Sequence, residues 1–102
     1  MSTVVLQSAV TSAPTTGTGF NIGGRPFSVQ AAEAGTGTVT ATVLVDVSDD
    51  NSNWTLAIIT IILNGASPQS DSFPCAAAYE WVRTRVTAIT GTSAAVTTTL
   101  AA

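Results

Sequence analysis

The stretch from residue 46 to residue 54, DVSDDNSNW, gathers the side chains of this chain that could bind a cation. Asp49, Asn51 and Asn53 stand two apart, as the first oxygen ligands of a calcium loop do. Such a loop also requires glycine at its sixth position and glutamate at its twelfth. Counted from Asp49 or from Asp46, neither position holds the required residue. We therefore predict no metal site, and we expect the Asx side chains to shape a tight turn.

Catalysis would have to use the six carboxylates, because the chain has no histidine and a single cysteine. Asp49 and Asp50 are adjacent and would point to opposite faces of a strand, so they are no acid–base pair. A carboxylate pair brought together by folding stays open. Cys75 lacks a histidine partner, cannot form an intrachain disulfide, and fits a small core residue. The sequence thus predicts no catalytic residues, no cofactor and no enzymatic activity.

Trp81, Arg83 and Arg85 alternate and therefore share one face of an expected strand. One interpretation is a surface ion pair with an acidic residue of a neighbouring strand, with the guanidinium stacked on the indole; the candidates are Asp46, Glu80 and Asp71. The other is a protein-contact cluster, because Trp and Arg are enriched in binding hot spots. The complete set of candidate contact residues is Phe20, Ile22, Arg25, Trp81, Arg83 and Arg85.

The composition is weakly charged: 9% of the residues are charged and 45% are hydrophobic, against a usual charged share of about 25%. A surface rich in Thr, Ser and Asn suits packing against other protein, because fewer long side chains lose entropy there. The net charge is −3, and the only cations are three arginines, which are too few to neutralise phosphates. We expect no direct binding of nucleic acid.

The N-terminal residues lack the basic region and the apolar core of a signal peptide. The longest apolar run, residues 54–63, is about half the length needed to cross a bilayer. We therefore expect synthesis in the cytoplasm without export, and no membrane partner.

Period-two alternation dominates the chain and predicts strands over residues 3–10, 25–33 and 38–48. In the third of these, Val39, Ala41, Val43, Val45 and Val47 share the buried face. Residues 34–37, AGTG, are expected to form a turn.

The run WTLAIITIILNG, residues 54–65, does not alternate. Its β-branched residues favour a strand buried on both sides, with a buried helix as the alternative, and Trp54 is expected to plug the core. Two further strands, one around residues 81–89 and one around 94–100, are expected to form a hairpin about Gly91.

Six to eight short strands in about 100 residues fit one all-β domain, an antiparallel, jelly-roll-like β-sandwich over residues 1–102. Residues 1–26 contain a Thr/Gly-rich stretch and are expected to extend as an arm that contacts neighbours.

Two segments, VDVSDDNSNWTLAIIT and YEWVRTRVTAITGTSAAVTTTLAA, resemble a pattern in small structural proteins of tailed bacteriophages. In that pattern a strand enters an Asp/Asn-rich turn closed by Trp, and an aromatic-x-x-Val-Arg strand follows before a Gly turn and a last alternating strand. The matching residues are Asp49, Asn51, Asn53, Trp54, Tyr79, Val82, Arg83, Val86, Gly91 and Val96.

The resemblance implies a virion component of the capsid decoration (cement) type. Such proteins commonly form homotrimers on the outer surface of the major capsid protein, where many weak contacts add up. Two alternatives stay open: a tail or head-fibre attachment module, and a carbohydrate-binding β-sandwich whose Trp54, Tyr79 and Trp81 would stack on sugar rings.

Overall fold

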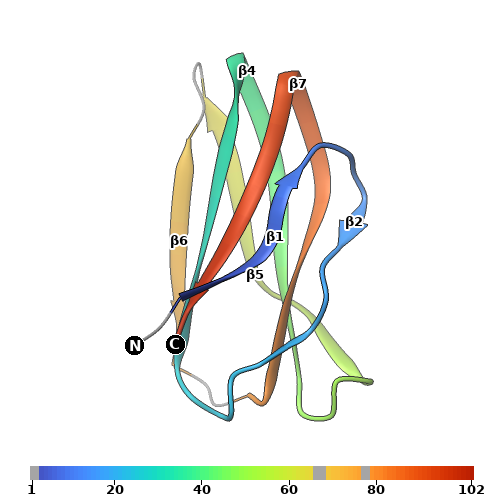
Figure 1. The fold of residues 1–102 in the computed structure, drawn as a ribbon, viewed down its shortest axis with the longest axis vertical. Helices are drawn as coiled ribbons and strands as arrows, with labels where there is room; N and C mark the ends of the chain where they lie inside the picture. The colour runs from blue at the N-terminus through green and yellow to red at the C-terminus, as the bar shows by residue number, and fades with distance from the viewer. Residues whose placement is uncertain (1–2, 66–68, 77–78) are drawn as a thin grey trace.

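The computed structural model describes residues 3–65, 69–76 and 79–102, and these form one antiparallel sheet of seven strands (Figure 1). The strands are β1 (Thr3–Val10), β2 (Thr15–Thr16), β3 (Phe20–Asn21), β4 (Phe27–Ser48), β5 (Trp54–Gly65), β6 (Ser70–Cys75) and β7 (Trp81–Ala101). The prediction of an all-β, antiparallel protein is confirmed. No helix of the length and apolarity needed to span a membrane occurs among the described residues.

Two long strands, β4 with 22 residues and β7 with 21, organise the whole molecule. They pair with each other along their entire length, from Ser28 opposite Ala101 to Ser48 opposite Trp81. The two strands expected over residues 25–33 and 38–48 are thus two halves of β4. The turn expected at residues 34–37 is instead a bend within β4, and β7 bends beside it. The register between β4 and β7 shifts at this bend.

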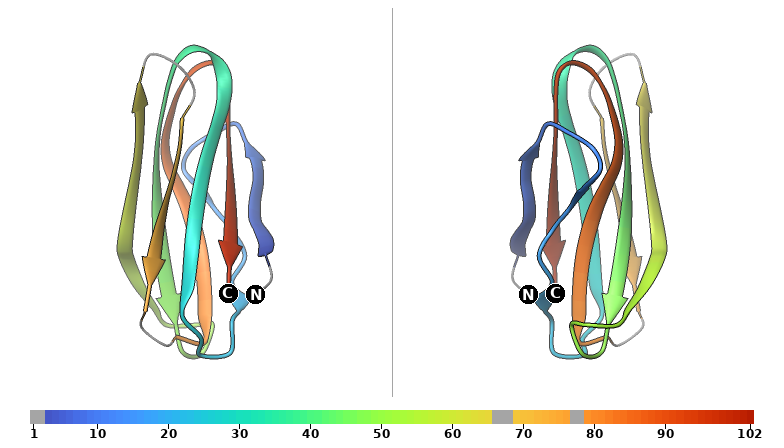
Figure 2. Two further views of the ribbon diagram at one scale, coloured as in Figure 1. Left: turned by 90° about the vertical axis from the view of Figure 1, so that its left-hand side faces the viewer. Right: turned by 90° about the vertical axis from the view of Figure 1, so that its right-hand side faces the viewer.

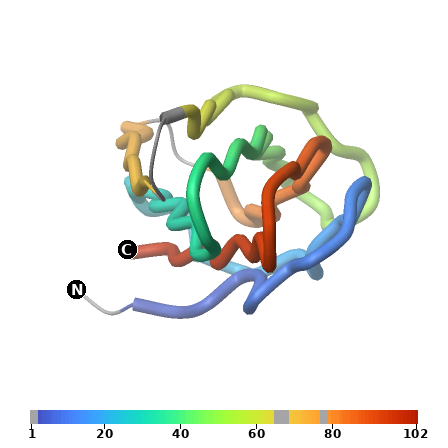
Figure 3. Tube along the Cα trace, turned by 90° about the horizontal axis from the view of Figure 1, so that it is seen from above, coloured from blue at the N-terminus to red at the C-terminus, as the bar shows by residue number. Residues whose placement is uncertain are grey.

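The bends fold the sheet over, so that its two halves face each other across the core (Figures 2 and 3). Thr84 and Thr98, both in β7, show this directly because their hydroxyl oxygens are 2.8 Å apart. Fourteen residues of straight strand would separate them by about 46 Å. The hairpin expected about Gly91 is therefore wrong: the two halves of β7 each pair with β4, not with each other.

Glycines occupy the bends of the paired strands β4 and β7, where the two backbones approach closely. Gly35 has a φ of +152°, and a Cβ there would lie 2.9 Å from the carbonyl oxygen of Thr92. Gly91 has a φ of +132°, and its Cβ would lie 3.0 Å from the carbonyl oxygen of Thr38. A side chain at either position would meet backbone, which cannot swing away as a flexible side chain can.

The sheet is open, with β1, β7, β4 and β5 in that order; β6 pairs with the first half of β4, and β2 and β3 pair with β7. The N-terminal segment, for which the sequence predicts an extended arm, pairs with strand β7 of its own chain. Thr3 pairs with Ala101, Thr15 with Val86, and Phe20 with Val82, so the segment lies along β7 of its own chain. The backbone groups of β7 provide the hydrogen bonds that hold it there.

The core lies between the two halves of the folded sheet and is built mainly from valine. The predicted inward set of β4 is confirmed: Val39, Val43, Val45 and Val47 are fully buried, and Ala41 is 3% exposed. Members of the core from other strands and segments include Ile22, Ile61, Leu63, Val82, Val86, Val96 and Leu100.

The expectation that β5 is buried on both sides is wrong. Ile61 and Leu63 point into the core, whereas Leu56 is 56% exposed and Ile62 is 64% exposed. The reason is topological: β5 is an edge strand of the order given above, and one of its faces points away from the core. An apolar sequence on that face therefore remains accessible.

Candidate protein-interaction surface

The outer side of the sheet over β5, β4 and β7 gathers the aromatic and basic side chains singled out in the sequence. Trp54 and Trp81 both pair with Ser48, and Arg83 pairs with Asp46. Directly paired residues of adjacent strands point to the same side of a sheet. We call the surface formed by Trp54, Trp81, Arg83 and Arg85 the Arg–Trp face.

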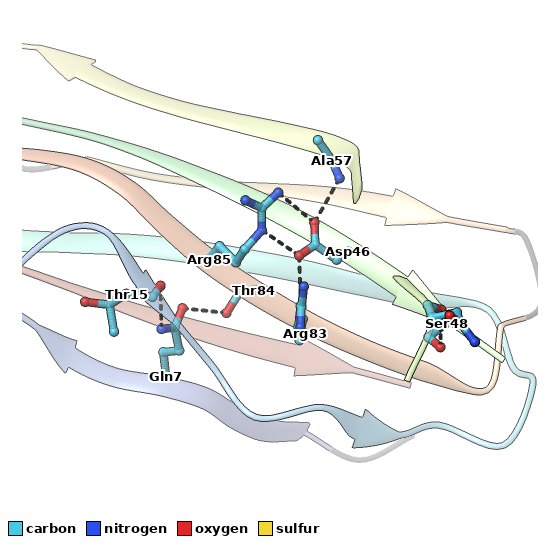
Figure 4. A network of polar contacts seen from close by, with 9 residues as sticks. Gln7, Thr15, Asp46, Ser48, Ala57, Arg83, Thr84 and Arg85 are labelled. Atoms are coloured by element: carbon cyan, nitrogen blue, oxygen red, sulfur yellow. Dashed lines mark hydrogen bonds and ion pairs between the residues drawn. The ribbon is translucent and has the colours of Figure 1, made fainter. Parts of the chain in front are cut away.

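Asp46 is fully buried beneath this face and binds both arginines (Figure 4). Arg83 Nε donates to Asp46 Oδ2 at 2.9 Å. Arg85 donates from Nε to Oδ2 at 2.6 Å and from Nη2 to Oδ1 at 3.0 Å. Of the three acidic partners considered from the sequence, Asp46 is the one that the described structure places against the arginines. Charge-assisted contacts of this kind fix the direction of both guanidinium groups.

A bulge in β5 supplies the remaining contact to Asp46. Between the pairs Val45–Ile59 and Val47–Thr55, the β5 strand carries three residues opposite Asp46 alone. The middle one, Ala57, has a φ of +56°, and its amide donates to Asp46 Oδ1 at 2.9 Å. The left-handed conformation is unfavourable for alanine, so the carboxylate compensates for local strain by satisfying the displaced amide.

The protonation state of Asp46 follows from these contacts. Burial by itself raises the pKa of a carboxyl group, because the charged form loses hydration. The hydrogen bonds from Arg85, Ala57 and Arg83 outweigh this effect and hold the pKa of Asp46 below its ordinary value. Asp46 is therefore an anion at neutral pH.

Trp54 lies on the Arg–Trp face and is not the expected plug of the core. The Arg83 guanidinium carbon is 4.3 Å from the centroid of the Trp54 ring, a cation–π contact. The stacking partner is thus Trp54 and not Trp81. The far edge of the same ring packs against Gly19, where an added Cβ would be 3.0 Å from Trp54 Cη2. Both contacts keep the indole in place.

The prediction that Asx side chains shape the turn between β4 and β5 is confirmed. Asp50 Oδ1 accepts hydrogen bonds from the amides of Ser52 and Asn53, at 2.9 and 2.8 Å. Ser48 Oγ also donates to this carboxylate, at 2.9 Å. These donors, with Asn53 first, hold the pKa of Asp50 well below its usual range. Within the described parts of the chain, no three His, Cys, Asp or Glu side chains are grouped as metal ligands.

The three N-terminal candidate contact residues have different environments. Phe20 is 38% exposed beside Val82, and Arg25 Nε donates to the carbonyl of Ile22 at 2.9 Å. Ile22 is fully buried in the core, so its side chain cannot reach a partner in this fold. Ile22 is therefore a core residue and not part of an exposed contact surface. Phe20 and Arg25 are not part of the Asp46-centred hydrogen-bond cluster.

Sequence reasoning missed the central position of Asp46 and the bulge that contacts it. Asp46 alternates with the inward-facing valines of β4 and so points to the opposite side of the strand, yet it is fully buried there. The signal was its isolation: among residues 34 to 48, an otherwise apolar and Thr-rich run, it is the one charged residue. A charge in such a strand requires a partner if neighbouring side chains cover it.

Two further features lie away from this face. Glu33 is 7% exposed, and its Oε1 accepts a hydrogen bond from the Gln69 amide at 3.2 Å. Its Oε2 is buried without a partner among the described residues, and burial raises the pKa of Glu33 against the effect of that amide.

An apolar pocket of about 300 Å³ near the C-terminus is lined in part by Cys75, Phe27 and Ala102. Cys75 is half-buried and packs against the core, so it is less buried than the core residue that the sequence predicts.

Comparison with known proteins gives a likeness of fold. No protein-family model matches the chain, and no curated protein does. Among solved structures, the crystal structure of the SPBc2 prophage-derived protein YomS is similar, with a TM-score of 0.64. The match covers 97% of this chain and 89% of that one, at 18% sequence identity. The two chains share a fold over almost their whole length.

Proposed function

We propose that this protein is a virion structural protein of a tailed bacteriophage, and that it decorates the capsid exterior by binding the major capsid protein. The observation that carries the proposal is the fold shared with a prophage-derived protein over nearly the whole chain. The Trp-and-Arg pattern that resembles phage structural proteins supports it independently. The proposed role is binding and not catalysis, without cofactor, nucleic acid or membrane.

The Arg–Trp face is the surface that we propose to contact the capsid. Trp and Arg are enriched in binding hot spots, and a fixed side chain loses less entropy on binding than a free one. Arg83 and Arg85 are held by Asp46, and Trp54 is held by Arg83 and Gly19. The face is thus organised before a partner arrives, which supports its use in recognition.

The folded sheet supports a finer interpretation of the fold as a jelly-roll-like sandwich of two layers. The two halves of β4 and of β7 contribute to a common core, as in a two-layer arrangement. In a decoration protein, one layer would face the capsid and the other the solvent. The net charge of −3 would help to keep the outer surfaces of neighbouring particles apart.

We propose self-association, as a homotrimer, along the edge strand β5. Its 12 residues carry no charge, and Leu56 and Ile62 are exposed on it. Uncharged apolar edges are the sites at which sheets associate. Light scattering after size-exclusion chromatography should give the mass of three chains for the wild type and of one for Ile62→Lys. Ser72→Lys, on the exposed strand β6, is the matched control; a monomeric wild type would refute the trimer.

Counting copies in purified virions by quantitative mass spectrometry tests the proposed function. A decoration protein is expected in hundreds of copies per particle, in a fixed ratio to the major capsid protein. A dozen copies or fewer would assign the protein to a tail or head fibre instead. Its absence from purified virions would refute a structural role.

A further inference from the structure

We propose that Arg83 and Arg85 together form a receptor for a second carboxylate, supplied by an acidic side chain of a partner protein. The inference deepens the proposed function and rests on it for the identity of the partner. The site itself can be tested without any partner.

The two arginines carry more positive charge than their one acidic partner neutralises. Two guanidinium groups share the single carboxylate of Asp46, and both Nε atoms bind the same oxygen, Oδ2. Neither arginine has another acidic partner in the part of the chain that is described. One positive charge is therefore left without a local counter-charge, in a protein whose net charge is −3. An incoming anion would relieve the repulsion between two cations held against one oxygen.

Both arginines keep hydrogen-bond donors that Asp46 does not use. A guanidinium carries five N–H donors in a planar fork. Arg83 uses Nε, and Arg85 uses Nε and Nη2, in hydrogen bonds to Asp46. The Nη atoms of Arg83 and Nη1 of Arg85 donate to no described residue, and the two side chains keep exposures of 21% and 22%. Donors thus remain on both arginines where solvent reaches them.

The site formed by Arg83 and Arg85 is pre-organised. Asp46 fixes the two guanidinium groups, and the Trp54 ring supports that of Arg83 from one side. A half-buried setting beside Trp54 and Trp81 lowers the local dielectric, which strengthens a charged hydrogen bond compared with bulk water. An anion that binds here meets donors that already point in fixed directions.

The chemistry favours a carboxylate of a protein over a nucleic-acid phosphate. A planar carboxylate matches a guanidinium fork with two parallel hydrogen bonds. A nucleic acid would need many neutralised phosphates, and the chain offers three cations in all. One excess charge with a few donors is suited to a single Asp or Glu side chain at a protein interface.

Nuclear magnetic resonance of the 15N-labelled protein tests the site with sodium acetate as the probe. Acetate replaces chloride at constant ionic strength and neutral pH, while the Arg Nε–H and Trp indole N–H signals are followed. The receptor predicts saturable shifts for Arg83, Arg85 and the two tryptophans. Arg25, whose Nε is bonded to the Ile22 carbonyl, is the internal control and should not move. Linear shifts without saturation, or an equal response of Arg25, would overturn the proposal.

Arg83→Lys provides the second measurement, because lysine keeps the charge and removes the planar fork. Acetate should bind about tenfold more weakly to this variant. Unchanged chemical shifts of the Trp indole N–H signals in the absence of acetate would show that the fold is retained. Equal affinity for acetate in the variant and the wild type would refute the role of the fork. The capsid proposal can fail separately. If the protein binds acetate saturably but is missing from virions, the carboxylate receptor is supported and the proposed capsid partner is refuted.

Discussion

Arg85 and Asp46 lie on adjacent strands and are joined by two hydrogen bonds, from Nε at 2.6 Å and from Nη2 at 3.0 Å. The carboxylate that receives them is fully buried and also binds Arg83 and the bulge amide of Ala57. One anion thereby joins β7, β4 and β5. The orientation of the Arg–Trp face depends on it.

Asp46→Asn should therefore destabilise the fold by about 2–4 kcal/mol, because it leaves two partly buried cations without their anion. Urea unfolding followed by tryptophan fluorescence measures this change. Asp49→Asn, at an exposed position of the neighbouring turn, is the matched control and should stay within about 0.5 kcal/mol of the wild type. Equal effects of the two substitutions would show that the Asp46 contacts do not contribute to stability.

The dependence of stability on pH should carry the signature of Asp46. Its pKa is lowered by folding, so its contribution is complete above the unfolded value of about 3.9 and is lost as the pH falls through the folded value. Urea unfolding measured from about pH 6 to about pH 2, the range in which carboxylates titrate, should show this loss of stability. Asp46→Asn should show less of it, with the remainder coming in part from Asp50. Identical pH profiles would contradict the assignment.

Glu33 should have the opposite dependence. Its pKa is raised by burial, so the folded state binds its proton more tightly than the unfolded state does. The wild type should thus lose stability as the pH rises from the unfolded value through the folded one. Glu33→Gln removes the charge and should be the more stable protein at neutral pH, with the difference shrinking toward pH 4, roughly the unfolded value. If Glu33→Gln were instead less stable than the wild type at neutral pH, the charged form of Glu33 would be the one favoured by folding.

The bulge at Ala57 predicts an unusual order of substitutions. Glycine adopts a positive φ without steric cost, so Ala57→Gly should be neutral within about 0.5 kcal/mol, although glycine normally weakens a strand. Ala57→Val places a β-branched side chain in the left-handed region and should cost more than about 1 kcal/mol. Thermal unfolding by circular dichroism ranks the variants. A valine variant as stable as the wild type would contradict the bulge geometry.

Period-two patterns made parts of this fold predictable. Val39, Val43, Val45 and Val47 occupy alternate positions, separated mostly by polar residues, and a strand with one buried face has this pattern for a direct physical reason. The strand over residues 3–10 was likewise evident and is β1. These are local properties, in which each residue is constrained by its neighbours along the chain.

The remaining features depend on contacts between distant parts of the chain. Gly35 and Gly91 are of a residue type that is common in hairpin turns. Nothing nearby in the sequence shows that they instead lie where the long strands β4 and β7 bend together. Apolar residues on both faces of β5 suggest full burial, whereas its position at the sheet edge exposes Ile62. The pairing of Asp46 with Arg83 was among the alternatives, but the burial of Asp46 follows from the packing above it.

We propose that the Arg–Trp face binds the capsid, and an add-back measurement tests this binding most directly. Purified protein is mixed with particles that lack it, and the bound copies are counted after sedimentation. The wild type should bind saturably, Trp81→Ala should bind about tenfold or more weakly, and Phe73→Ala, an exposed aromatic on β6, should bind like the wild type. Trp81→Ala binding as tightly as the wild type, or no binding of the wild type, would contradict the claim.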